Sequence, residues 1–294
     1  TVGICPLAEV KAAATAPFWF QLYMIRDRGY VENLLKKAWD SGCQTLIFTI
    51  DLPLPGPRHR DTRNGLNSAG ARSVALKAQQ LLSRPGWLWQ VAIKGKPLTF
   101  GNLSDAVPEA SNLDSFKQWV DTQFDASVTW QAIEWLRERW PGKLILKGIL
   151  EVDDAKAAVN VGADGIVVSN HGGRQLDFGP GGLDALPGVV AAAGDRLTVM
   201  MDGGVRRGSH ALIARALGAK MVFAGRPFLW GASVSGAAGL DHVIALFRKE
   251  IDIDLALMGC PRAEDIGPAH VTPHAAPGGL APSAAPNETY RGAA

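Results

Sequence analysis

The sequence predicts an α/β fold built on a parallel sheet, and three observations carry this prediction. Short apolar runs alternate with stretches of helical periodicity along most of the 294 residues, which is the pattern of repeated strand–helix–strand units. The runs are rich in β-branched or aromatic residues and are bounded by glycine, proline or polar residues, as buried parallel strands are. Glycine is frequent, with 33 residues, which suits tight turns between strands and helices.

Six strands and four helices are predicted from these patterns. The first helix carries Leu34, Leu35 and Ala38 at helical spacing, and the second opens with acidic residues, which suit a helix N-terminus. The predicted strands are 18–23, 45–51, 144–148, 165–169, 197–202 and 221–225. The predicted helices are 31–41, 151–161, 207–217 and 239–258.

Composition excludes several classes of protein. Hydrophobic residues make up 47% and charged residues 20% of the chain, which excludes a wholly disordered chain, a coiled coil or a collagen. No apolar run reaches the ~18 residues that span a bilayer. The net charge of +2 gives no electrostatic reason to expect a nucleic-acid partner. Three cysteines without C-x-x-C spacing and no leader pattern at the N-terminus favour a reducing, cytoplasmic setting.

Two segments interrupt the alternation. Residues 52–142 separate the second and third strands and carry most of the tryptophans, as a lid or binding segment does. Trp87 and Trp89, close to Arg84 and Lys94 and to a further lysine at position 96, suit the surface of a membrane. A tryptophan-rich lid packed on the body of the protein is the alternative. The tail, 267–294, is rich in Pro, Ala and Gly and is predicted to be disordered.

Polar residues follow every predicted strand at its carboxyl end. In parallel α/β folds, sites are built along that edge, and a barrel brings the residues together where a doubly wound sheet spreads them out. The alternative is that polar residues only mark the ends of the strands. The residues concerned are Gln21, Tyr23, Thr49, Asp51, Lys147, Ser169, Asp202 and Arg226.

The ends of the last two strands predict a phosphate site. The sequence DGGVR over 202–206 follows the fifth strand, and Gly225 and Arg226 follow the sixth. Glycines expose backbone N–H groups, each arginine adds a fork of donors, and barrels commonly bind phosphate after their last two strands. The chain has no P-loop and no strand-placed G-x-G-x-x-G, which disfavours a nucleoside triphosphate and a Rossmann-bound NAD.

The segment SNHGGRQLD over 169–177 carries the predicted chemistry. His171 lies on a glycine-flanked loop and suits a general base, and Arg174 suits a bidentate bond to a carboxylate. Asp51 suits the role of a carboxylate that orients the imidazole and stabilises its charged form. Lys147 is expected beside a cofactor, where its charge stabilises a reduced, anionic ring.

Other charged and metal-binding residue types give weaker predictions. Arg58 lies on the loop after the second strand, where a role toward the substrate and a solvated charged loop are equally compatible with its spacing. The other five histidines have no ligand-like i, i+4 partner within a predicted helix, so no metal site is predicted.

These motifs together resemble the FMN-dependent 2-hydroxy-acid dehydrogenase and oxidase family. The resemblance runs from Thr1 to about residue 267, and its most specific part is SNHGGRQLD. Further matches are FQLY at 20–23, TID at 49–51, LKG at 146–148, DGGVR at 202–206 and GRP at 225–227. Within that family the long segment after the second strand and residues 254–261 look most similar to the bacterial membrane-associated L-lactate and mandelate dehydrogenases.

The resemblance implies a fold, a cofactor and a set of roles. The fold is a (β/α)8 TIM barrel that holds FMN and assembles as a tetramer. His171 is then the base, Asp51 its partner, and Arg174 the residue that binds the substrate carboxylate, with Tyr23 and Arg58 also serving the substrate. Residues expected at FMN are Gln21, Thr49, Lys147 and Ser169 at the ring, Asp202 at the ribityl chain, and Gly204, Arg206, Gly225 and Arg226 at the phosphate.

The resemblance also implies a departure from the family. Two strands precede the strand that ends in Tyr23 in the family, so residues 1–266 are expected to form a partial barrel with an insertion, about 52–142, after the fourth family strand. The expected reaction is oxidation of an L-2-hydroxy acid, with L-lactate as the leading substrate. Electrons are expected to pass to a quinone or a cytochrome, in a homotetramer peripheral to the inner face of the cytoplasmic membrane.

Three alternatives remain at this point. The first is a truncated chain without activity. The second is a mandelate- or glycolate-type enzyme of the same family. The third is a flavin-free barrel enzyme that acts on a phosphorylated sugar.

Overall fold

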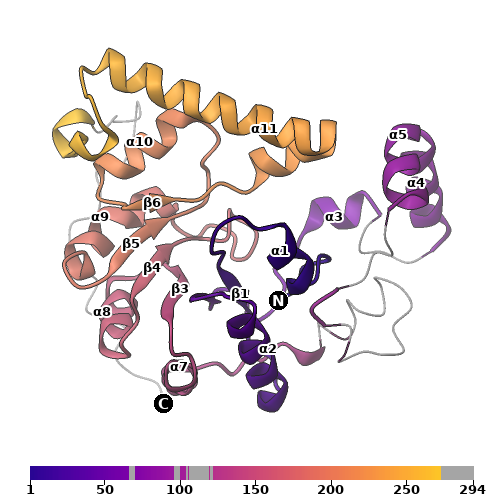
Figure 1. Cartoon of the computed structure of the whole chain (residues 1–294), viewed down its shortest axis with the longest axis horizontal. Helices are drawn as coiled ribbons and strands as arrows, with labels where there is room; N and C mark the ends of the chain where they lie inside the picture. The colour runs from indigo at the N-terminus through magenta and orange to yellow at the C-terminus, as the bar shows by residue number, and fades with distance from the viewer. Residues whose placement is uncertain (66–69, 96–99, 104, 106–118, 120–121, 273–294) are drawn as a thin grey trace.

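The fold is a six-stranded parallel sheet with its strands in chain order. The computed structural model describes residues 1–65, 70–95, 100–103, 105, 119 and 122–272. Figure 1 shows the strands at the centre of the molecule with helices around them. The strands are β1 (Phe20–Leu22), β2 (Thr45–Thr49), β3 (Lys143–Ile149), β4 (Gly165–Val168), β5 (Thr198–Met201) and β6 (Met221–Val222). All six predicted strands are confirmed, and most end earlier than predicted because their polar carboxyl ends leave the hydrogen-bonded ladder.

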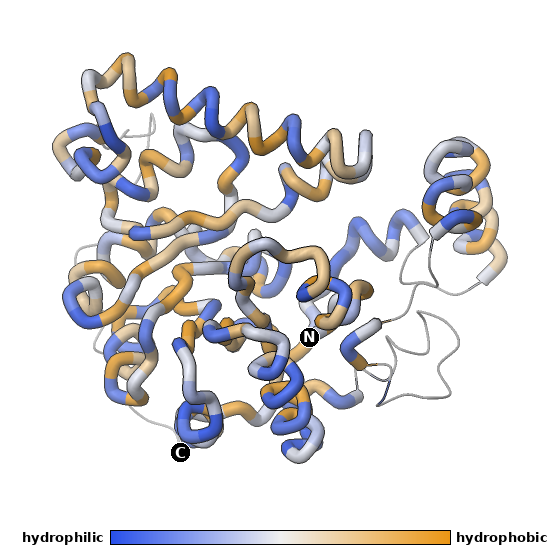
Figure 2. The backbone as a smooth tube through the Cα atoms, in the orientation of Figure 1, coloured by the Kyte–Doolittle hydropathy of each residue, from blue (hydrophilic) through white to orange (hydrophobic). Residues whose placement is uncertain are grey.

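Side chains of the strands alternate between two buried faces, as the two-residue period of a strand requires. Leu46 and Leu144 belong to the main core between the sheet and the helices. The other face carries a smaller cluster of Ile145, Val167 and Met200. Apolar residues on both faces explain why these strands read as continuous hydrophobic runs. Figure 2 shows hydrophobic colour along the central strands.

The smaller cluster fixes which polar residues share a face. Ile47 and Phe223 pack against that cluster from the neighbouring strands. Counting two residues onward along each strand, from position 47, 145, 167 or 200, reaches the carboxyl end of the same face. The residues reached are Thr49, Lys147, Ser169 and Asp202. The sheet therefore presents the predicted site residues on one side.

The sheet is curled rather than flat. Trp19 directly precedes β1 and Phe223 directly follows β6, which are the two outermost strands of the described sheet. Their rings meet edge to face with centroids 5.8 Å apart. The first and last strands therefore approach one another, as strands of a barrel do.

All four predicted helices form. Three of them cover the outer face of the sheet, whereas the fourth, over 239–258, packs on the helix over 207–217. Asp27 accepts a hydrogen bond from the Tyr30 N–H at 3.0 Å and so caps α2. The helix then buries Leu34, Leu35 and Ala38, which confirms its predicted apolar face. The helices around the sheet are α1 (Leu7–Ala13), α2 (Arg28–Asp40), α7 (Trp130–Arg139), α8 (Val152–Asn160), α9 (Gly182–Ala193), α10 (Gly208–Ala216) and α11 (Arg226–Leu257).

Two helices differ from the sequence prediction. The sequence did not predict α9, because Pro187 lies inside it and removes a backbone donor, yet α9 buries Leu186 and Val189. The predicted helix 239–258 is the second half of α11, whose backbone leaves helical geometry at Ser235 and Gly236. The first half begins directly after Gly225, at the predicted phosphate site.

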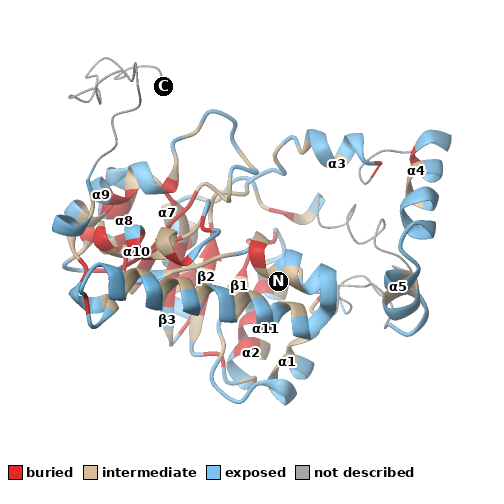
Figure 3. Cartoon of the chain, turned by 90° about the horizontal axis from the view of Figure 1, so that it is seen from above, coloured by how far each residue is buried: buried red, intermediate tan, exposed pale blue. Residues whose placement is uncertain are grey.

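The segment 52–142 is an insertion only in part. Its helices α3 (His59–Arg63), α4 (Ala71–Leu82), α5 (Pro85–Trp87) and η1 (Leu88–Ile93) lie on one side of the molecule, with α4 and α5 away from the sheet in both Figure 1 and Figure 3. By contrast, α7 buries Ile133 and Leu136 in the main core. The predicted insertion therefore extends too far, because a sheet-covering helix lies within it.

The predicted disordered tail also begins too early. Ala263–Asp265 (η3) and Pro268–His270 (η4) are short 3₁₀ turns. Val271 packs against a small cluster that includes Leu212 and Ile266. Residues 273–294, which make up the rest of the predicted tail, lie outside the described residues, as does the lysine at position 96 that was grouped with Trp87 and Trp89.

Candidate active site

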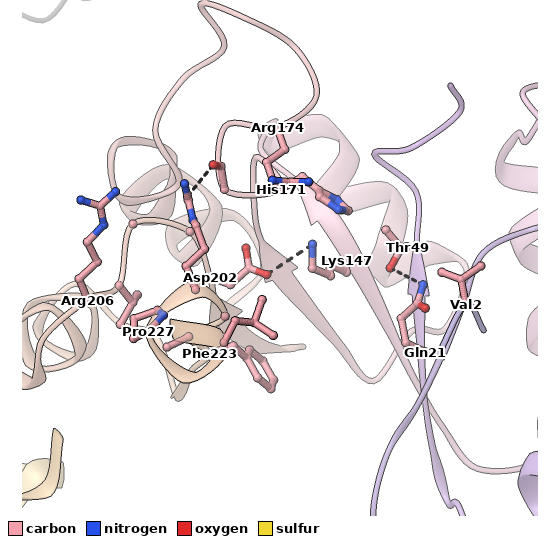
Figure 4. A pocket seen from close by; sticks show the side chains of 18 of the residues that line it. Val2, Gln21, Thr49, Lys147, His171, Arg174, Asp202, Arg206, Phe223 and Pro227 are labelled. Carbon is pink, nitrogen blue, oxygen red and sulfur yellow. Dashed lines mark hydrogen bonds and ion pairs between the residues drawn. The ribbon is translucent and has the colours of Figure 1, made fainter. Parts of the chain in front are cut away.

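A cavity of about 690 Å³ opens at the carboxyl ends of the strands. Its size lies within the range of about 300–1,000 Å³ that is typical of ligand sites. Figure 4 shows side chains that lie in β1, β2 and β3 or follow β4, β5 and β6 around it. Most of the predicted site residues line this cavity: Gln21, Tyr23, Thr49, Lys147, His171, Arg174, Asp202, Gly204, Arg206, Gly225 and Arg226. Asp51, Arg58 and Ser169 do not line the cavity. Asp51 contacts His171, Ser169 contacts Lys147, and the charge of Arg58 affects the pKa of Tyr23.

His171 and Asp51 form the predicted pair. The Nδ1 atom of His171 lies 2.8 Å from Oδ1 of Asp51, and their side chains are only 17% and 13% exposed. A carboxylate at Nδ1 orients the ring and leaves Nε2 available to a substrate. This arrangement makes His171 a candidate general base.

A glycine in β3 makes room for the pair. The register of β3 against β4 shifts between Lys147 and Ile149, which is a β-bulge. Gly148, inside the bulge, has φ +107°, and a Cβ there would lie 2.6 Å from Cβ of Asp51. Any residue with a side chain at this position would collide with Asp51. Glycine at position 148 therefore lets Asp51 lie next to β3, within 3.8 Å of Lys147 Nζ.

The loop after β4 holds the base in an unusual backbone conformation. His171 has φ +57°, in the left-handed region that residues other than glycine seldom adopt. Its N–H donates to Oγ of Ser169 at 3.0 Å. Asn170 accepts a bond from the Gly173 N–H at 3.1 Å and donates one to Pro180 O at 3.2 Å. Asn170 follows the predicted fourth strand as one of the polar strand-end residues, and no separate role was predicted for it, although its side chain can form turns of this kind.

Lys147 lies between two carboxylates. Its Nζ donates to Oγ of Ser169 at 3.0 Å and lies 3.4 Å from Oδ2 of Asp202 and 3.8 Å from Oδ2 of Asp51. The second oxygen of Asp202, Oδ1, and Oδ2 of Asp51 are buried and have no hydrogen-bond partner among the residues that the structure describes. Buried polar atoms are nearly always paired, so these oxygens indicate a ligand or water at the cavity.

The amide of Gln21 reaches the neighbouring strand. Its Nε2 donates to Oγ1 of Thr49 at 3.0 Å. The amide oxygen accepts from the Thr1 amino group at 3.4 Å and keeps a second lone pair for a ligand, on the wall opposite Asp202 (Figure 4).

Tyr23 is a donor beside the base. Burial in the first place, with the Asp51 charge adding to it, raises the pKa of Tyr23 to about 12, against the opposing effect of Arg58 and Arg174. The phenol therefore keeps its proton at neutral pH. Its ring packs on Phe124 with centroids 5.0 Å apart. Phe124 fixes the position of the phenol, a role that the sequence analysis did not assign.

Two arginines lie near Tyr23. Arg174 is 43% exposed, and its Nη2 lies 3.9 Å from Oδ2 of Asp61 in α3. The Nε atom of Arg58 is buried and has no hydrogen-bond partner within the described part of the chain. Both guanidinium groups therefore keep donors for an anion at this end of the cavity.

The loop after β2 contacts the loop that carries His171. We call residues 170–174 of this second loop the base loop. Gln175, the next residue, donates from Nε2 to Leu54 O at 2.9 Å. Gly56 lies so close that a Cβ there would be 2.5 Å from the carbonyl oxygen of Arg174. The sequence analysis assigned neither Gln175 nor Gly56, because a contact between distant loops leaves no periodic pattern.

The opposite end of the cavity suits an anion. Gly204, with φ +73°, and Gly225 have nothing within 4 Å of where a Cβ would lie, so their backbone faces open space. Arg206 and Arg226 line the same end. His210 lies behind this loop, with Nδ1 3.2 Å from both the Arg206 N and Gly204 O. This combination of exposed backbone and arginine forks is a phosphate-binding arrangement.

The cavity therefore suits an elongated ligand with a polar ring and a phosphate. Lys147, Gln21 and Thr49 offer charged and polar atoms at its centre, and the unpaired Oδ1 of Asp202 offers an acceptor between the centre and the phosphate end. In the described residues no group of three or more His, Cys, Asp or Glu side chains is placed to hold a metal ion.

Comparison with known proteins identifies the family. The model of the FMN-dependent dehydrogenase family matches residues 1–273. L-lactate dehydrogenase of Caulobacter sp. (strain K31) is 46% identical over 266 residues, which cover 90% of this chain and 70% of that protein. L-lactate dehydrogenase of Actinobacillus pleuropneumoniae serotype 5b (strain L20) is 42% identical over 266 residues, which cover 90% of this chain and 69% of that protein.

Solved structures agree with the family match. The monotopic membrane protein (S)-mandelate dehydrogenase superposes with a TM-score of 0.82 and 35% identity, over 90% of this chain and 69% of that one. A mandelate oxidase superposes with a TM-score of 0.70 and 35% identity, over 88% of this chain and 65% of that one. The curled parallel sheet is thus of the TIM-barrel type, and the cavity with a base at one end and a phosphate cradle at the other suits FMN and a small acid. The chain belongs to the FMN-dependent dehydrogenase family and is an FMN-dependent 2-hydroxy-acid dehydrogenase.

Proposed function

We propose that the chain oxidises L-lactate to the 2-oxo acid, with His171 as the base. The observation that carries the proposal is the His171–Asp51 pair at 2.8 Å, beside Arg174 and Tyr23 and across the cavity from the phosphate cradle. Relatives named L-lactate dehydrogenase support the choice of substrate. A base, an anion-binding arginine and a site for a two-electron acceptor are the three parts that oxidation of a hydroxy acid needs.

The chain's own residues hold the cofactor in this proposal. Bound FMN supplies the two-electron acceptor of the reaction. Lys147 offers a positive charge beside the ring, where it stabilises added negative charge, and Ser169 supports Lys147 through the 3.0 Å bond between them. The remaining contacts are Gln21 and Thr49 at the ring, Asp202 at the ribityl chain, and Gly204, Arg206, Gly225 and Arg226 at the phosphate.

The substrate is held and deprotonated at the other end. Arg174 binds the carboxylate of the hydroxy acid as a bidentate partner, with Arg58 close by. Tyr23 donates its phenolic hydrogen to the same substrate. His171 takes one proton on Nε2, because Nδ1 faces Asp51, and Asp51 stabilises the resulting charge. The hydroxy acid loses two electrons and two protons in all. One proton goes to His171, the two electrons and the second proton would be taken up by bound FMN, and the 2-oxo acid leaves.

Anaerobic mixing tests this proposal. The purified 294-residue chain is loaded with FMN and mixed with L-lactate, D-lactate, (S)-mandelate or glycolate, and loss of flavin absorbance is followed. We expect rapid loss with L-lactate and none with D-lactate. Faster loss with (S)-mandelate or glycolate contradicts the lactate assignment, and mandelate has specific support in the solved structures that superpose on this chain. A chain that binds FMN and is bleached by no hydroxy acid is an inactive fragment.

We propose further that the enzyme works at a membrane surface and passes electrons to a quinone or cytochrome there. Trp87, Trp89 and Ile93, in α5 and η1, are 40%, 53% and 60% exposed. Lys94 lies over the Trp89 ring at 5.1 Å, and α4 buries only Ser73. Exposed aromatic residues beside cations suit a lipid interface, and poor burial disfavours a lid packed on the barrel. None of the described helices has the length and apolar character to cross a bilayer.

Vesicle sedimentation tests the membrane contact. Trp87→Ser/Trp89→Ser is compared with the wild type on vesicles of anionic lipid, and Trp39→Ser serves as the control because Trp39 is 41% exposed on α2, away from this segment. We expect the double variant to lose most of its binding and the control to keep it. Equal binding of all three proteins contradicts the proposal. Light scattering of the same samples tests the proposed homotetramer.

A further inference from the structure

Two arginines that the sequence places alike are held differently in the structure. Arg206 follows β5 and Arg226 follows β6, and both line the phosphate end of the cavity. The Arg206 guanidinium lies over the Trp230 ring, 5.8 Å from its centroid. The Nη2 atom of Arg226 instead donates a 2.7 Å hydrogen bond to the carbonyl oxygen of Gly172. Arg226 therefore contacts the base loop as well as the phosphate end.

The loop that Arg226 contacts needs external partners. His171, Gly172 and Gly173 all have left-handed backbone angles, with φ of 57°, 68° and 69°. The two glycines adopt this region without steric cost. His171 carries a Cβ, so its left-handed conformation is costly and persists only where the surroundings hold it. The strand side of the loop is held by its own residues, since Ser169 binds the His171 N–H and Asn170 binds the Gly173 N–H.

Arg226 supplies the bond from the other side. It is the first residue of α11, separated from the end of β6 by three residues, so it anchors the base loop to a different part of the barrel. A Cβ at Gly172 would lie 3.0 Å from Nη2 of Arg226, so the guanidinium packs closely on the glycine as well as bonding its carbonyl. The residue directly before this carbonyl is the base, His171.

We propose that Arg226 is a positioning residue for the base and couples the phosphate end of the cavity to it. A guanidinium has five N–H donors in a rigid fork, so Arg226 can bind Gly172 O through one edge and a phosphate through its other donors. Binding of a phosphate then fixes Arg226, and Arg226 fixes Gly172 and the direction of His171. This inference rests on the proposed function in one respect, the role of His171 as the base.

Hydrogen exchange of the base loop, residues 170–174, gives a measurement that does not depend on turnover. We expect Arg226→Met to raise the exchange rate of these amides about tenfold or more in the full chain. In the wild type, FMN slows their exchange more than riboflavin does, because riboflavin lacks the phosphate. Arg226→Lys keeps the positive charge but lacks the forked guanidinium. Compared with Arg226→Met, we expect it to regain much of the FMN affinity but little of the slow amide exchange of the base loop.

Two further variants separate this role from ordinary phosphate binding. Arg207→Met is the control, because Arg207 is 70% exposed and pairs with Glu250 at 3.2 Å, and we expect wild-type exchange, FMN affinity and turnover. Arg206→Met weakens FMN binding about 10- to 100-fold and leaves exchange of the base loop unchanged. At saturating FMN, Arg226→Met lowers kcat about 10- to 100-fold, as misplacement of a catalytic group does, with a smaller change in KM.

The outcomes separate the two proposals. If Arg226→Met weakens FMN binding but leaves both loop exchange and kcat at saturating FMN at wild-type values, the positioning role is overturned. If no hydroxy acid bleaches the wild-type flavin, the proposed function fails. In that case the exchange difference between Arg226→Met and Arg207→Met in the flavin-free chain still decides the positioning role. Circular dichroism checks that each variant is folded, and Arg226→Lys serves if Arg226→Met is not.

Discussion

Asp51 shows how a single charge supports the proposed base. Its Oδ1 lies 2.8 Å from Nδ1 of His171, while Oδ2 has no hydrogen-bond partner in the described ranges. Asp51→Asn keeps the shape and a hydrogen bond but removes the charge that stabilises a protonated imidazole. A hydrogen bond to a charged group is worth about 1.5–3 kcal/mol, so we expect kcat to fall roughly 10- to 100-fold.

Stopped-flow bleaching of the flavin under anaerobic conditions measures this effect. Asp153→Asn is the matched control, because the Asp153 side chain is 94% exposed on α8 and pairs only with Lys156 among the described residues. Equal rates for wild type and Asp51→Asn would remove Asp51 from the mechanism. A loss of FMN affinity in Asp51→Asn, without a loss of rate at saturation, would assign it to the cofactor instead.

Tyr23 leads to a prediction about pH. Its pKa is raised to about 12, by burial first and by Asp51 second, and burial, with Asp105, raises the pKa of Tyr30 to about 12. A raised pKa stabilises the folded chain below the ordinary tyrosine pKa of 10.0, and this stabilisation disappears as the pH rises from 10 toward 12. Tyr23→Phe should therefore remove tyrosinate absorbance from the part of the titration near pH 12. Removal of a component near pH 10 would contradict the burial of the phenol.

At the scale of residues, the sequence predicted which side chains belong to the site better than it predicted which residues contact one another. His171, Arg174 and Lys147 were predicted because titratable residues at strand ends, flanked by glycine, are uncommon without a site. The bond from Arg226 to Gly172 was not predicted, because it joins two strand ends that only the curled sheet brings together. The hydrogen bond from Gln175 to the carbonyl oxygen of Leu54 was not predicted for the same reason.

Among the secondary-structure elements, Asp164 ties β3 to β4 at the end opposite the active site. Its Oδ2 accepts from the Leu144 N–H at 2.9 Å and lies 3.1 Å from Nη1 of Arg137, while Oδ1 accepts from Lys143 at 2.7 Å. Burial acts to raise the pKa of Asp164, but these hydrogen bonds and charges outweigh burial and lower it. Asp164→Asn removes the charge-assisted bonds and should cost about 1.5–3 kcal/mol in the free energy of unfolding.

Urea unfolding at several pH values measures this prediction. Because the pKa of Asp164 is lowered on folding, its stabilising effect is present above the ordinary aspartate pKa of 3.8 and disappears as the pH falls through the folded value. The difference between wild type and Asp164→Asn should shrink accordingly in acid. Asp40→Asn, which removes an exposed pair with Lys36, should change stability by about 0.5 kcal/mol or less. A constant difference at all pH values would contradict the ionic origin of the effect.

The elements that the sequence predicted are those with regular spacing. The strands β2 and β3 carry apolar residues on both faces, such as Leu144 on one face and Ile145 on the other. In α2, Leu34, Leu35 and Ala38 follow the helical period. Helix α9 was missed because Pro187 breaks the local pattern, although Leu186 and Val189 bury well in the fold. Helix α7 was not predicted, because it lies within the segment 52–142, whose tryptophans are also typical of a lid or binding segment.

For the whole molecule, the curled sheet explains why distant residues form one site. Neighbouring parallel strands place their carboxyl ends side by side, and the contact of Trp19 with Phe223 closes the curve from β1 toward β6. The cavity of about 690 Å³ lies inside this curve, with the base at one end and the phosphate cradle at the other. The sequence showed which residues end each strand, and the curvature determines that they meet.

A ligand that bridges both ends should therefore stabilise the whole molecule. Binding to the folded state alone adds about 2.7 kcal/mol at a concentration 100 times Kd, which raises Tm by on the order of 5–10 °C for a chain of this size. We expect FMN to produce this shift in differential scanning fluorimetry. Riboflavin at the same concentration should produce a smaller one, because it leaves Gly204, Arg206, Gly225 and Arg226 without a phosphate.

Two results would contradict this account of the cavity. Equal shifts with FMN and riboflavin would mean that the arginines after β5 and β6 do not bind the phosphate. No shift with either ligand would mean that the described sheet does not hold the family's cofactor by itself. In Arg206→Met the difference between FMN and riboflavin should narrow, whereas in Arg207→Met, whose side chain pairs with Glu250, it should equal the wild-type difference. The comparison thus locates the phosphate cradle from the stability of the whole chain, without any need for turnover.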